Sequence, residues 1–439
     1  MAVIIHNSNL EVYLQRDWSR ESLDQLESLL ISRGTFEFPS LPNGLFPAAV
    51  AEGYTGYGNV WVRDNVHLAH HFHVLGETHC AAGIVRGLTQ FLMTQTSKIE
   101  QVIAGELTHD DPMNRPHVRF EGGSLTELDE KWSHAQNDAL GYYLWIACEL
   151  LLAREIEFAR AEIDLLLLFP ALFRHFRFWQ DKDSGHWEET RKVSASSIGT
   201  AIRGLQSLVK LLADRADLPG MNSVRRASLF PEIEDLISHG MQTLSKTLPW
   251  ECRSDDPLER RQYDGALLFL IYPLGLLDPN SGQAEKIVSD VRKHLQGEIG
   301  IRRYPGDSYW CADYKEKLPE ETRTADFSDD LSLRDSLLKP GEEAQWCIFD
   351  PIISVIYGQR FLASGQPADR ELQIEYFNRS IGQISGAGGE WPEFRCPESY
   401  FLSRGIWRPN DVTPLLWTQA NLRLAFHQMR QTLDRSEVL

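Results

Sequence analysis

The sequence predicts an all-α protein whose helices form hairpins arranged in a ring, with the long loops gathered on one face. Apolar residues recur at helical spacing along most of the 439 residues. Long loops rich in Pro, Gly, Asp and aromatic residues follow about every second helix, and long loops within a compact domain are usually functional. No low-complexity linker interrupts this pattern. We therefore expect one domain over residues 1–439.

About twelve segments carry the helical pattern. Leucines recur at helical spacing in residues 22–30, and residues 64–75 and 80–96 are amphipathic. Residues 134–153 are apolar on most faces, which predicts a buried helix. The other predicted helices are residues 159–178, 194–212, 231–247, 265–277, 284–296, 344–362, 371–386 and 413–433. The long loops between helices are residues 34–62, 103–131, 179–193, 250–264, 297–343 and 387–412.

Charge and cysteine usage exclude several classes of partner. The net charge of −18 comes from interspersed acids and bases, which argues against a nucleic acid or an anionic membrane as partner. No apolar run reaches the length of about 18 residues that a membrane span needs, and the N-terminus lacks the basic start of a signal peptide. The six cysteines are dispersed, so we expect reduced thiols in a cytoplasmic protein.

A tryptophan followed by two adjacent acids, Trp187-Glu188-Glu189, comes just after a turn signal. Acid-catalysed cleavage of a glycosidic bond needs a protonated carboxyl held against an apolar wall, because burial raises its pKa. An indole supplies such a wall and also stacks on a sugar face. The alternative interpretation is an exposed Trp-Glu-Glu triplet without catalytic function.

A second group of carboxylates, Glu390, Glu393 and Glu398, lies among aromatic residues, prolines and glycines. The prolines and glycines predict a loop, where catalytic groups are common. Glycoside hydrolysis usually needs two carboxyl groups on opposite sides of the scissile bond, so the two groups together favour that chemistry. The alternative is a solvated loop with an aromatic anchor.

The predicted loops also hold residues suited to binding a sugar. Arg63 and Asp64 follow Trp61, and such a pair can donate to and accept from sugar hydroxyls; the alternative is a helix-terminal Asp in a structural ion pair. Residues 132–138 and 303–310 mix charged, polar and aromatic side chains in the same way. His67 and His71 could share a metal, but no nearby acid completes a familiar motif.

These segments, taken in order, resemble glycoside hydrolase family 15, which includes the glucoamylases, and a related domain of the phosphorylase kinase α and β subunits. The resemblance runs from about residue 35 to 430. It rests on residues 61–64 (Trp-Val-Arg-Asp), 132–139 (Trp-Ser-His-Ala-Gln-Asn-Asp-Ala), 184–189 (Ser-Gly-His-Trp-Glu-Glu), 303–309 (Arg-Tyr-Pro-Gly-Asp-Ser-Tyr), 397–400 (Pro-Glu-Ser-Tyr) and 414–417 (Pro-Leu-Leu-Trp).

The resemblance implies an (α/α)6 barrel of six hairpins with its active site on the loop-rich face. It implies an inverting, exo-acting α-glucosidase that releases β-D-glucose from the ends of an α-glucan or of malto- or isomalto-oligosaccharides, with no metal or other cofactor. Glu188 matches the general acid and Glu398 best matches the general base. The implied substrate-binding residues are Trp61, Arg63, Asp64, Trp132, Gln136, Asp138, Trp187, Glu189, Arg303, Tyr309 and Trp417.

Two alternatives stay open from the sequence. Glu390 or Glu393 could replace Glu398 as the base. Residues 44–48, 60–65 and 264–268 look closer to the kinase subunits, so a non-catalytic, glucan-sensing or regulatory module is the second candidate function. For an inverting enzyme we expect the two carboxyl groups about 6.5–9.5 Å apart. We also expect the acid to have a raised pKa and the base a low one.

Overall fold

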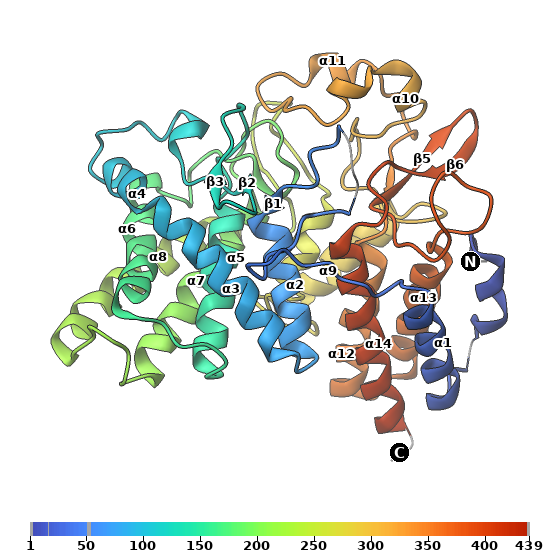
Figure 1. The fold of residues 1–439 in the computed structure, drawn as a ribbon, viewed down its shortest axis with the longest axis horizontal. Coiled ribbons are helices and arrows are strands. Elements are labelled where there is room, and N and C mark those ends of the chain that lie inside the picture. The colour runs from blue at the N-terminus through green and yellow to red at the C-terminus, as the bar shows by residue number, and fades with distance from the viewer. Residues whose placement is uncertain (1–2, 16, 51–53, 437–439) are drawn as a thin grey trace.

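The computed structural model describes residues 3–15, 17–50 and 54–436, which are mainly helical, as the sequence predicts (Figure 1). The α-helices are α1 (Arg20–Ser32), α2 (Val62–Val74), α3 (Thr78–Thr94), α4 (Thr96–Ile103), α5 (Asn137–Leu152), α6 (Arg160–Phe176), α7 (Ala195–Asp214), α8 (Ser223–Thr247), α9 (Gly282–Asp290), α10 (Tyr314–Lys317), α11 (Ser332–Asp335), α12 (Phe349–Ser364), α13 (Pro367–Gly382) and α14 (Leu416–Ser436). The 3₁₀ and π turns are η1 (Ser8–Tyr13), η2 (Pro112–Asn114), η3 (Gly185–Trp187), η4 (Gly265–Leu270), η5 (Val291–Leu295) and η6 (Glu320–Thr322).

Six elements of the described chain form an inner ring, in which each element packs on the next and the last returns to the first. In order they are α2, α5, α7, η4, α12 and α14. An outer layer covers them: α3 packs on α2, α8 on α7, α9 on η4, α13 on α12 and α1 on α14, while α6 contacts α3 and α8. This arrangement fits the alternating hairpins that the sequence predicts.

Two glycines let α5 and α7 approach each other closely. A Cβ added at Gly141 would lie 2.7 Å from the carbonyl of Thr200, and one added at Gly204 would lie 2.7 Å from the carbonyl oxygen of Gly141. Both distances are shorter than van der Waals contact, so the helix spacing depends on these residues. The apolar character of α5 agrees with its position, because nearly all of its side chains are buried.

Three helix predictions need correction. Of residues 265–277, only Gly265–Leu270 form a helical turn, the 3₁₀ turn η4. An α-helix does not continue to residue 277, because Pro273 cannot donate a backbone hydrogen bond and Gly275 has a φ of +59°. The helix predicted from residue 344 begins at Phe349, since Gln345–Trp346 pair with another strand. Helix α8 begins at Ser223 and contains Pro231, which was predicted to start it. Helix α4 was not predicted.

Two small three-stranded sheets stand on the loop-rich side of the ring, where the all-α prediction included none (Figure 1). The first sheet contains β1 (Val60–Trp61), β2 (Arg119–Glu121) and β3 (Thr126–Glu127), and the second contains β4 (Gln345–Trp346), β5 (Ser399–Ser403) and β6 (Ile406–Pro409). Strand β1 leads directly into α2, and β4 ends shortly before α12 begins. The two strands therefore fix the loops at the ends of these inner helices.

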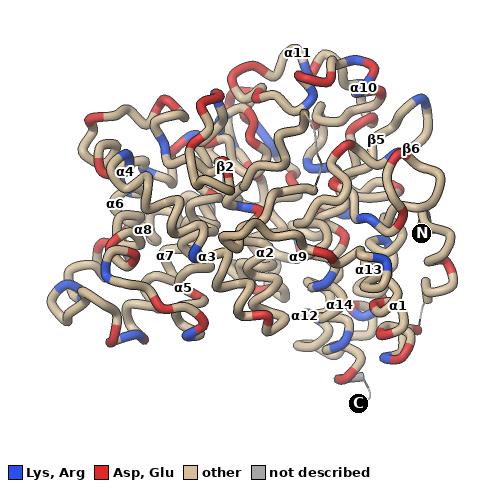
Figure 2. The backbone as a smooth tube through the Cα atoms, viewed as in Figure 1, with Lys and Arg blue, Asp and Glu red and all other residues tan. Residues whose placement is uncertain are grey.

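Acidic and basic residues are interspersed over the helices and loops in the view of Figure 2. Within the described residues, none of the helices combines the length and apolar character that a bilayer span requires.

The close approach of α5 and α7 yields a stability prediction. We expect Gly141→Ala to lower the free energy of unfolding by about 2 kcal/mol, because overpacking a buried contact forces backbone shifts. Denaturant unfolding followed by circular dichroism measures this change. Gly282→Ala, at the start of α9 with nothing within 4 Å of an added Cβ, is the control and should not destabilise. Equal stability of the two variants would contradict the packing argument.

Candidate active site

A cavity lies at the N-terminal ends of α2 and α14, with an empty volume of about 770 Å³ including its opening. It gathers ten of the residues predicted for the site: Trp61, Arg63, Asp64, Trp132, Trp187, Glu188, Arg303, Tyr309, Glu398 and Trp417. These residues come from segments spread over most of the chain, so the ring brings them together. Gln136, Asp138 and Glu189 do not line this cavity.

Glu188 ends the 3₁₀ turn η3 in the left-handed conformation, with φ 58° and ψ 44°. This conformation costs a non-glycine residue about 1 kcal/mol and is common at functional sites. The carboxylate accepts hydrogen bonds from Trp61 Nε1 at 3.0 Å and Gln136 Nε2 at 3.2 Å. Only 18% of the side chain is exposed. Burial raises the pKa of Glu188 although Arg63 opposes the shift, as expected for a general acid.

Glu398 comes immediately before β5 and is almost completely buried. Its Oε1 accepts a hydrogen bond from Tyr57 Oη at 2.8 Å, and its Oε2 accepts one from Asn410 Nδ2 at 2.5 Å. Burial raises the pKa of Glu398 to about 7, while these two hydrogen bonds act against the shift. The prediction that the base has a low pKa is therefore wrong for Glu398, because the effect of burial on its pKa exceeds the opposing effect of the two hydrogen bonds.

A pair of aromatic rings connects the two carboxylates. The ring centres of Tyr57 and Trp61 are 5.2 Å apart. Tyr57 donates to Glu398 and Trp61 donates to Glu188, so neighbouring side chains on one wall of the cavity hold both acids. The separation of 6.5–9.5 Å between the carboxyl groups stays a prediction of an inverting site.

Arg63 is buried, and its orientation is set from behind the cavity wall. Its Nε donates to Asp138 Oδ2 at 2.7 Å, and its Nη2 donates to Gln136 Oε1 at 2.5 Å. Asp138 and Gln136 were predicted to bind substrate, but they contact Arg63 and, in the case of Gln136, also Glu188. They therefore orient cavity residues rather than line the cavity themselves.

Asp64 lies on the cavity side of the same helix start. Burial raises its pKa to about 7, against the attraction of Arg63. None of the described basic side chains forms an ion pair with it. A buried carboxylate with unused acceptor capacity is suited to hold sugar hydroxyls.

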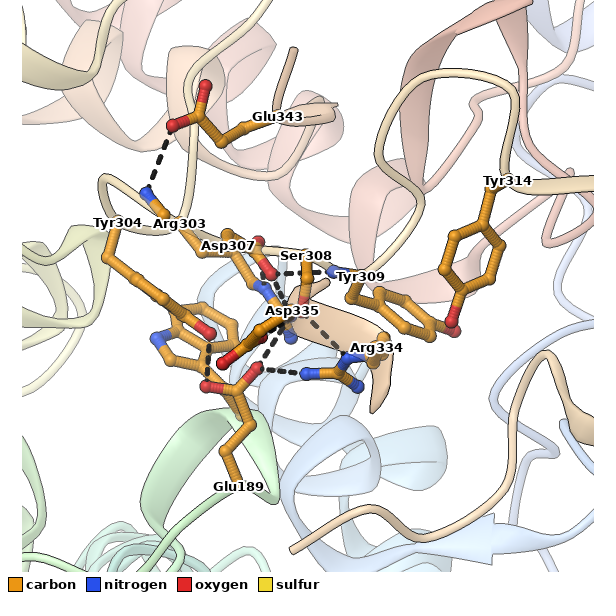
Figure 3. A network of polar contacts seen from close by, with 12 residues as sticks. Glu189, Arg303, Tyr304, Asp307, Ser308, Tyr309, Tyr314, Arg334, Asp335 and Glu343 are labelled. Carbon is orange, nitrogen blue, oxygen red and sulfur yellow. Dashed lines mark hydrogen bonds and ion pairs between the residues drawn. The ribbon is translucent and has the colours of Figure 1, made fainter. Parts of the chain in front are cut away.

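The carboxylate of Glu189 lies in a network of buried charges (Figure 3), and Glu189 does not line the cavity. Its carboxylate contacts three guanidinium groups, those of Arg303 at 3.1 Å, Arg334 at 2.8 Å and Arg261 at 3.3 Å. Tyr304 also donates to it. Burial alone would raise the pKa of Glu189, but the arginines lower it to about 2. Glu189 therefore lies outside the cavity lining with its oxygens already partnered, and direct binding of substrate by it stays a prediction.

Arg303 connects this network to the cavity. Its guanidinium binds Asp307 through two hydrogen bonds of 2.6 Å. The rings of three cavity residues surround the guanidinium carbon, with Trp346 at 4.8 Å, Tyr309 at 5.1 Å and Trp187 at 5.3 Å. The cationic group therefore orients the aromatic wall on which a sugar could stack.

Four functional residues were missing from the predicted set: Tyr57, Asn410, Arg334 and Trp346. Tyr57 stood in an aromatic-rich loop, which was a usable signal. Asn410 and Trp346 reach the site through the pairing of β5 with β6 and β4, and the pairing of such short strands left no clear pattern in the sequence. Arg334 lies in α11, within the predicted 297–343 loop, where the sequence does not indicate which arginine is buried.

The other two candidate bases lie outside the cavity lining. Glu390 is 60% exposed and pairs with Lys315 at 3.1 Å. Glu393 accepts a hydrogen bond from Asn9 at 3.3 Å at the surface. Of these three glutamates, the cavity geometry therefore favours Glu398.

The histidines of α2 are packed among aromatic residues. His67 stacks on Trp417 with ring centres 4.3 Å apart, and His71 lies 5.1 Å from the ring of Phe38. Burial lowers the pKa of both imidazoles well below the usual value. In the part of the chain that the structure describes, no group of three His, Cys, Asp or Glu side chains is arranged to hold a metal ion.

The sequence pattern described as glycosyl hydrolases family 15 matches residues 36–391. The chain belongs to this family. The match includes Glu188 and ends shortly before Glu398. The family match does not assign a role to either carboxyl, so both assignments rest on the geometry of the cavity.

Solved structures of a glycosidase and of a glucoamylase share the fold. A glycosidase variant in complex with glucose aligns with a TM-score of 0.63 at 16% identity, over 94% of this chain and 99% of that chain. The glucoamylase from Saccharomycopsis fibuligera aligns with a TM-score of 0.62 at 11% identity, over 95% of this chain and 97% of that chain. At these identities the likeness shows the fold, which is the glucoamylase-like (α/α)6 architecture.

Two curated relatives point to different classes of protein. The probable phosphorylase b kinase regulatory subunit alpha of Caenorhabditis elegans is 27% identical over 285 residues, covering 57% of this chain and 21% of the relative. The isomaltose glucohydrolase of Kribbella flavida is 23% identical over 275 residues, covering 61% of this chain and 66% of the relative. The chain thus matches about a quarter or less of the length of the kinase subunits.

The Glu189 network yields a prediction about stability. We expect Glu189→Gln to lower the free energy of unfolding by about 3 kcal/mol, because three buried guanidinium groups lose their shared anion. Thermal and denaturant unfolding measure the change. Glu285→Gln is the matched control, since Glu285 pairs with Arg360 but is 54% exposed, and it should cost less than about 1 kcal/mol. A stability of Glu189→Gln close to that of the control would show that the network contributes little.

Proposed function

We propose that this chain is an inverting, exo-acting α-glucoside hydrolase that releases β-D-glucose from the ends of an α-glucan or of malto- or isomalto-oligosaccharides. The observation that carries the proposal is the presence of Glu188 and Glu398 in one aromatic-walled cavity, each held by its own hydrogen-bond donors. Membership of a glycoside hydrolase family supports the reaction class.

In this proposal Glu188 is the general acid. Its raised pKa keeps a proton available, and the carboxyl gives that proton to the glycosidic oxygen as the bond to the anomeric carbon breaks. Glu398 is the general base, which takes a proton from a water molecule that attacks the opposite face of the sugar. The product has inverted configuration. Exchange of protons with solvent then returns Glu188 to its acid form and Glu398 to its base form.

The other cavity residues would bind and orient the terminal sugar. The Asp64 carboxylate accepts hydrogen bonds from sugar hydroxyls, and Trp61, Trp132 and Trp187 offer faces for stacking. A buried polar group loses its partner when a hydroxyl is missing, so this site would discriminate well among sugars. Arg63 supplies positive charge beside Glu188, at 3.6 Å from its Oε1, which stabilises the carboxylate after the proton leaves.

A non-catalytic, glucan-sensing or regulatory module is the second candidate, and the likeness to the kinase subunit favours it. The two candidates differ in a simple assay. The hydrolase releases β-D-glucose from maltose, isomaltose or maltooligosaccharides, and polarimetry or proton NMR reports the configuration. A regulatory module binds the saccharide and releases no glucose. Release of α-D-glucose would exclude the inverting mechanism.

Replacing each carboxylate tests the assigned roles. We expect Glu188→Gln to lower kcat by at least about 100-fold while circular dichroism stays unchanged, because the amide keeps the shape and cannot donate the proton. Glu398→Ala should lose activity and regain it with azide, which replaces the activated water and yields a glycosyl azide of inverted configuration. Glu393→Ala, on the same loop but outside the cavity, is the control. Azide rescue at Glu390 or Glu393, with Glu398→Ala fully active, would overturn the assignment.

The hydrogen bond from Tyr57 to Glu398 predicts a shift in pH dependence. The base acts only when ionised, so the low-pH limb of kcat/KM should rise through the pKa of Glu398, which is about 7. Tyr57→Phe removes a donor that stabilises the carboxylate, so the pKa of Glu398 should rise and the limb should move to higher pH. Tyr13→Phe, at a residue that does not line the cavity, is the control. An unchanged limb, or a shift to lower pH, would count against Glu398 as the base.

A further inference from the structure

One segment of the 297–343 loop covers the outer side of the cavity. We call residues 323–335 the cover segment; it follows α10 and η6 and ends with α11, and both α10 and α11 stand above the ring in Figure 1. Four consecutive residues of the segment, Thr324, Ala325, Asp326 and Phe327, line the cavity. The wall on this side therefore comes from a loop rather than from the helices of the ring.

Arg334 anchors the inner end of the cover segment. The side chain is buried, and its Nη2 donates to Glu189 Oε1 at 2.8 Å while its Nε donates to Ser308 Oγ at 3.0 Å (Figure 3). Its guanidinium carbon lies 5.6 Å from the ring centre of Phe327. Glu189 directly follows Glu188, the candidate acid. The contact between Arg334 and Glu189 therefore connects the cover segment to the turn that carries Glu188.

Lys131 anchors the outer edge of the segment from the opposite rim. Its ammonium group lies 4.0 Å from Asp326 and pairs with Asp329, and the next residue, Trp132, lines the other side of the cavity. Lys131 is 49% exposed and Asp329 is 74% exposed, so this ion pair lies at the surface. The two rims of the cavity thus meet in a bridge at its outer end.

A third contact holds the beginning of the segment. Arg323 donates to Tyr54 Oη at 3.3 Å and lies 3.7 Å from Asp411. Lys315 also pairs with Asp411. The cover segment is therefore attached to the loop before β1, to the loop before α5 and to the loop after β6, which together surround the cavity. Both acidic and basic residues occur around α10 and α11 in Figure 2.

From these contacts we infer that the cover segment limits the substrate to short saccharides, di- and trisaccharides rather than long α-glucan chains. This inference rests on the proposed function. The sugar units beyond the cleaved bond must leave the cavity on its outer side, where Asp326, Phe327 and the Lys131 bridge stand. A longer chain must break the bridge and displace the segment, whereas a disaccharide fits beneath it.

The two anchors differ in strength, which predicts how the restriction can be relaxed. Exposed ion pairs contribute little to stability and are screened by salt, so the Lys131 bridge can open. The Arg334 anchor is buried and shared with Glu189, and removing one partner of such a pair is strongly destabilising. Lys131 is therefore the position at which chain-length preference can be changed without disturbing the catalytic turn.

The test compares kcat/KM for glucose release from maltose, maltotriose and maltoheptaose. We expect the wild-type protein to prefer maltose over maltoheptaose by at least about tenfold. Lys131→Ala should reduce this preference about fivefold by raising kcat/KM for maltoheptaose, while kcat/KM for maltose stays within about twofold. Exchanging the charges, with Lys131→Asp and Asp329→Lys together, should restore the preference. Lys286→Ala is the control, because Lys286 is 55% exposed in an ion pair on α9.

The outcomes separate this inference from the proposed function. Equal use of maltose and maltoheptaose by the wild-type protein would overturn the role of the cover segment and leave the hydrolase assignment intact. Release of glucose from no saccharide would overturn the hydrolase assignment. In that case, calorimetry measures the affinities for maltose and maltoheptaose. Tighter binding of maltose that is lost in Lys131→Ala supports the role of the cover segment. Equal affinities of the wild-type protein for the two sugars refute that role.

Discussion

The organisation of the site depends on the buried carboxylate of Glu189. It collects Arg261 from the 250–264 loop and both Arg303 and Arg334 from the 297–343 loop. Removing a carboxylate from water is costly, and three guanidinium groups with good geometry offset that cost. Because Glu189 is fixed from its side-chain end, the preceding residue is held in a left-handed conformation that an unsupported loop would rarely keep.

The two candidate catalytic carboxyls are buried alike, so burial alone does not give them different roles. Burial raises the pKa of both. The difference lies in their neighbours: Glu188 has a guanidinium nearby and an indole donor, whereas Glu398 has a phenol and an amide and no cation within ion-pair distance among the described residues. A bound sugar would further change the environment of each.

Local chemistry was readable from the sequence, and tertiary pairing was not. The helical periodicity of residues 134–153 predicted a buried helix, which the structure shows as α5, and the Trp-Glu-Glu triplet at 187–189 directed attention to Glu188, which lines the cavity. The orientation of Glu189 could not be predicted, because adjacent acids on a loop look alike until their partners are known. The short strands that bring Asn410 and Trp346 to the site depend on pairing between segments far apart in the chain.

The closure of the ring between α2 and α14 also has a consequence for how the protein is made. Helix α2 is buried from Val62 to Phe72, and α14, which packs on it, begins only at Leu416. During synthesis α2 is made long before α14, so the apolar surface of α2 that packs on α14 stays exposed until the end of the chain has been made. Contacts between such distant segments form slowly and expose intermediates to aggregation. The cavity, which needs both Asp64 and Trp417, would therefore be among the last features of the molecule to form.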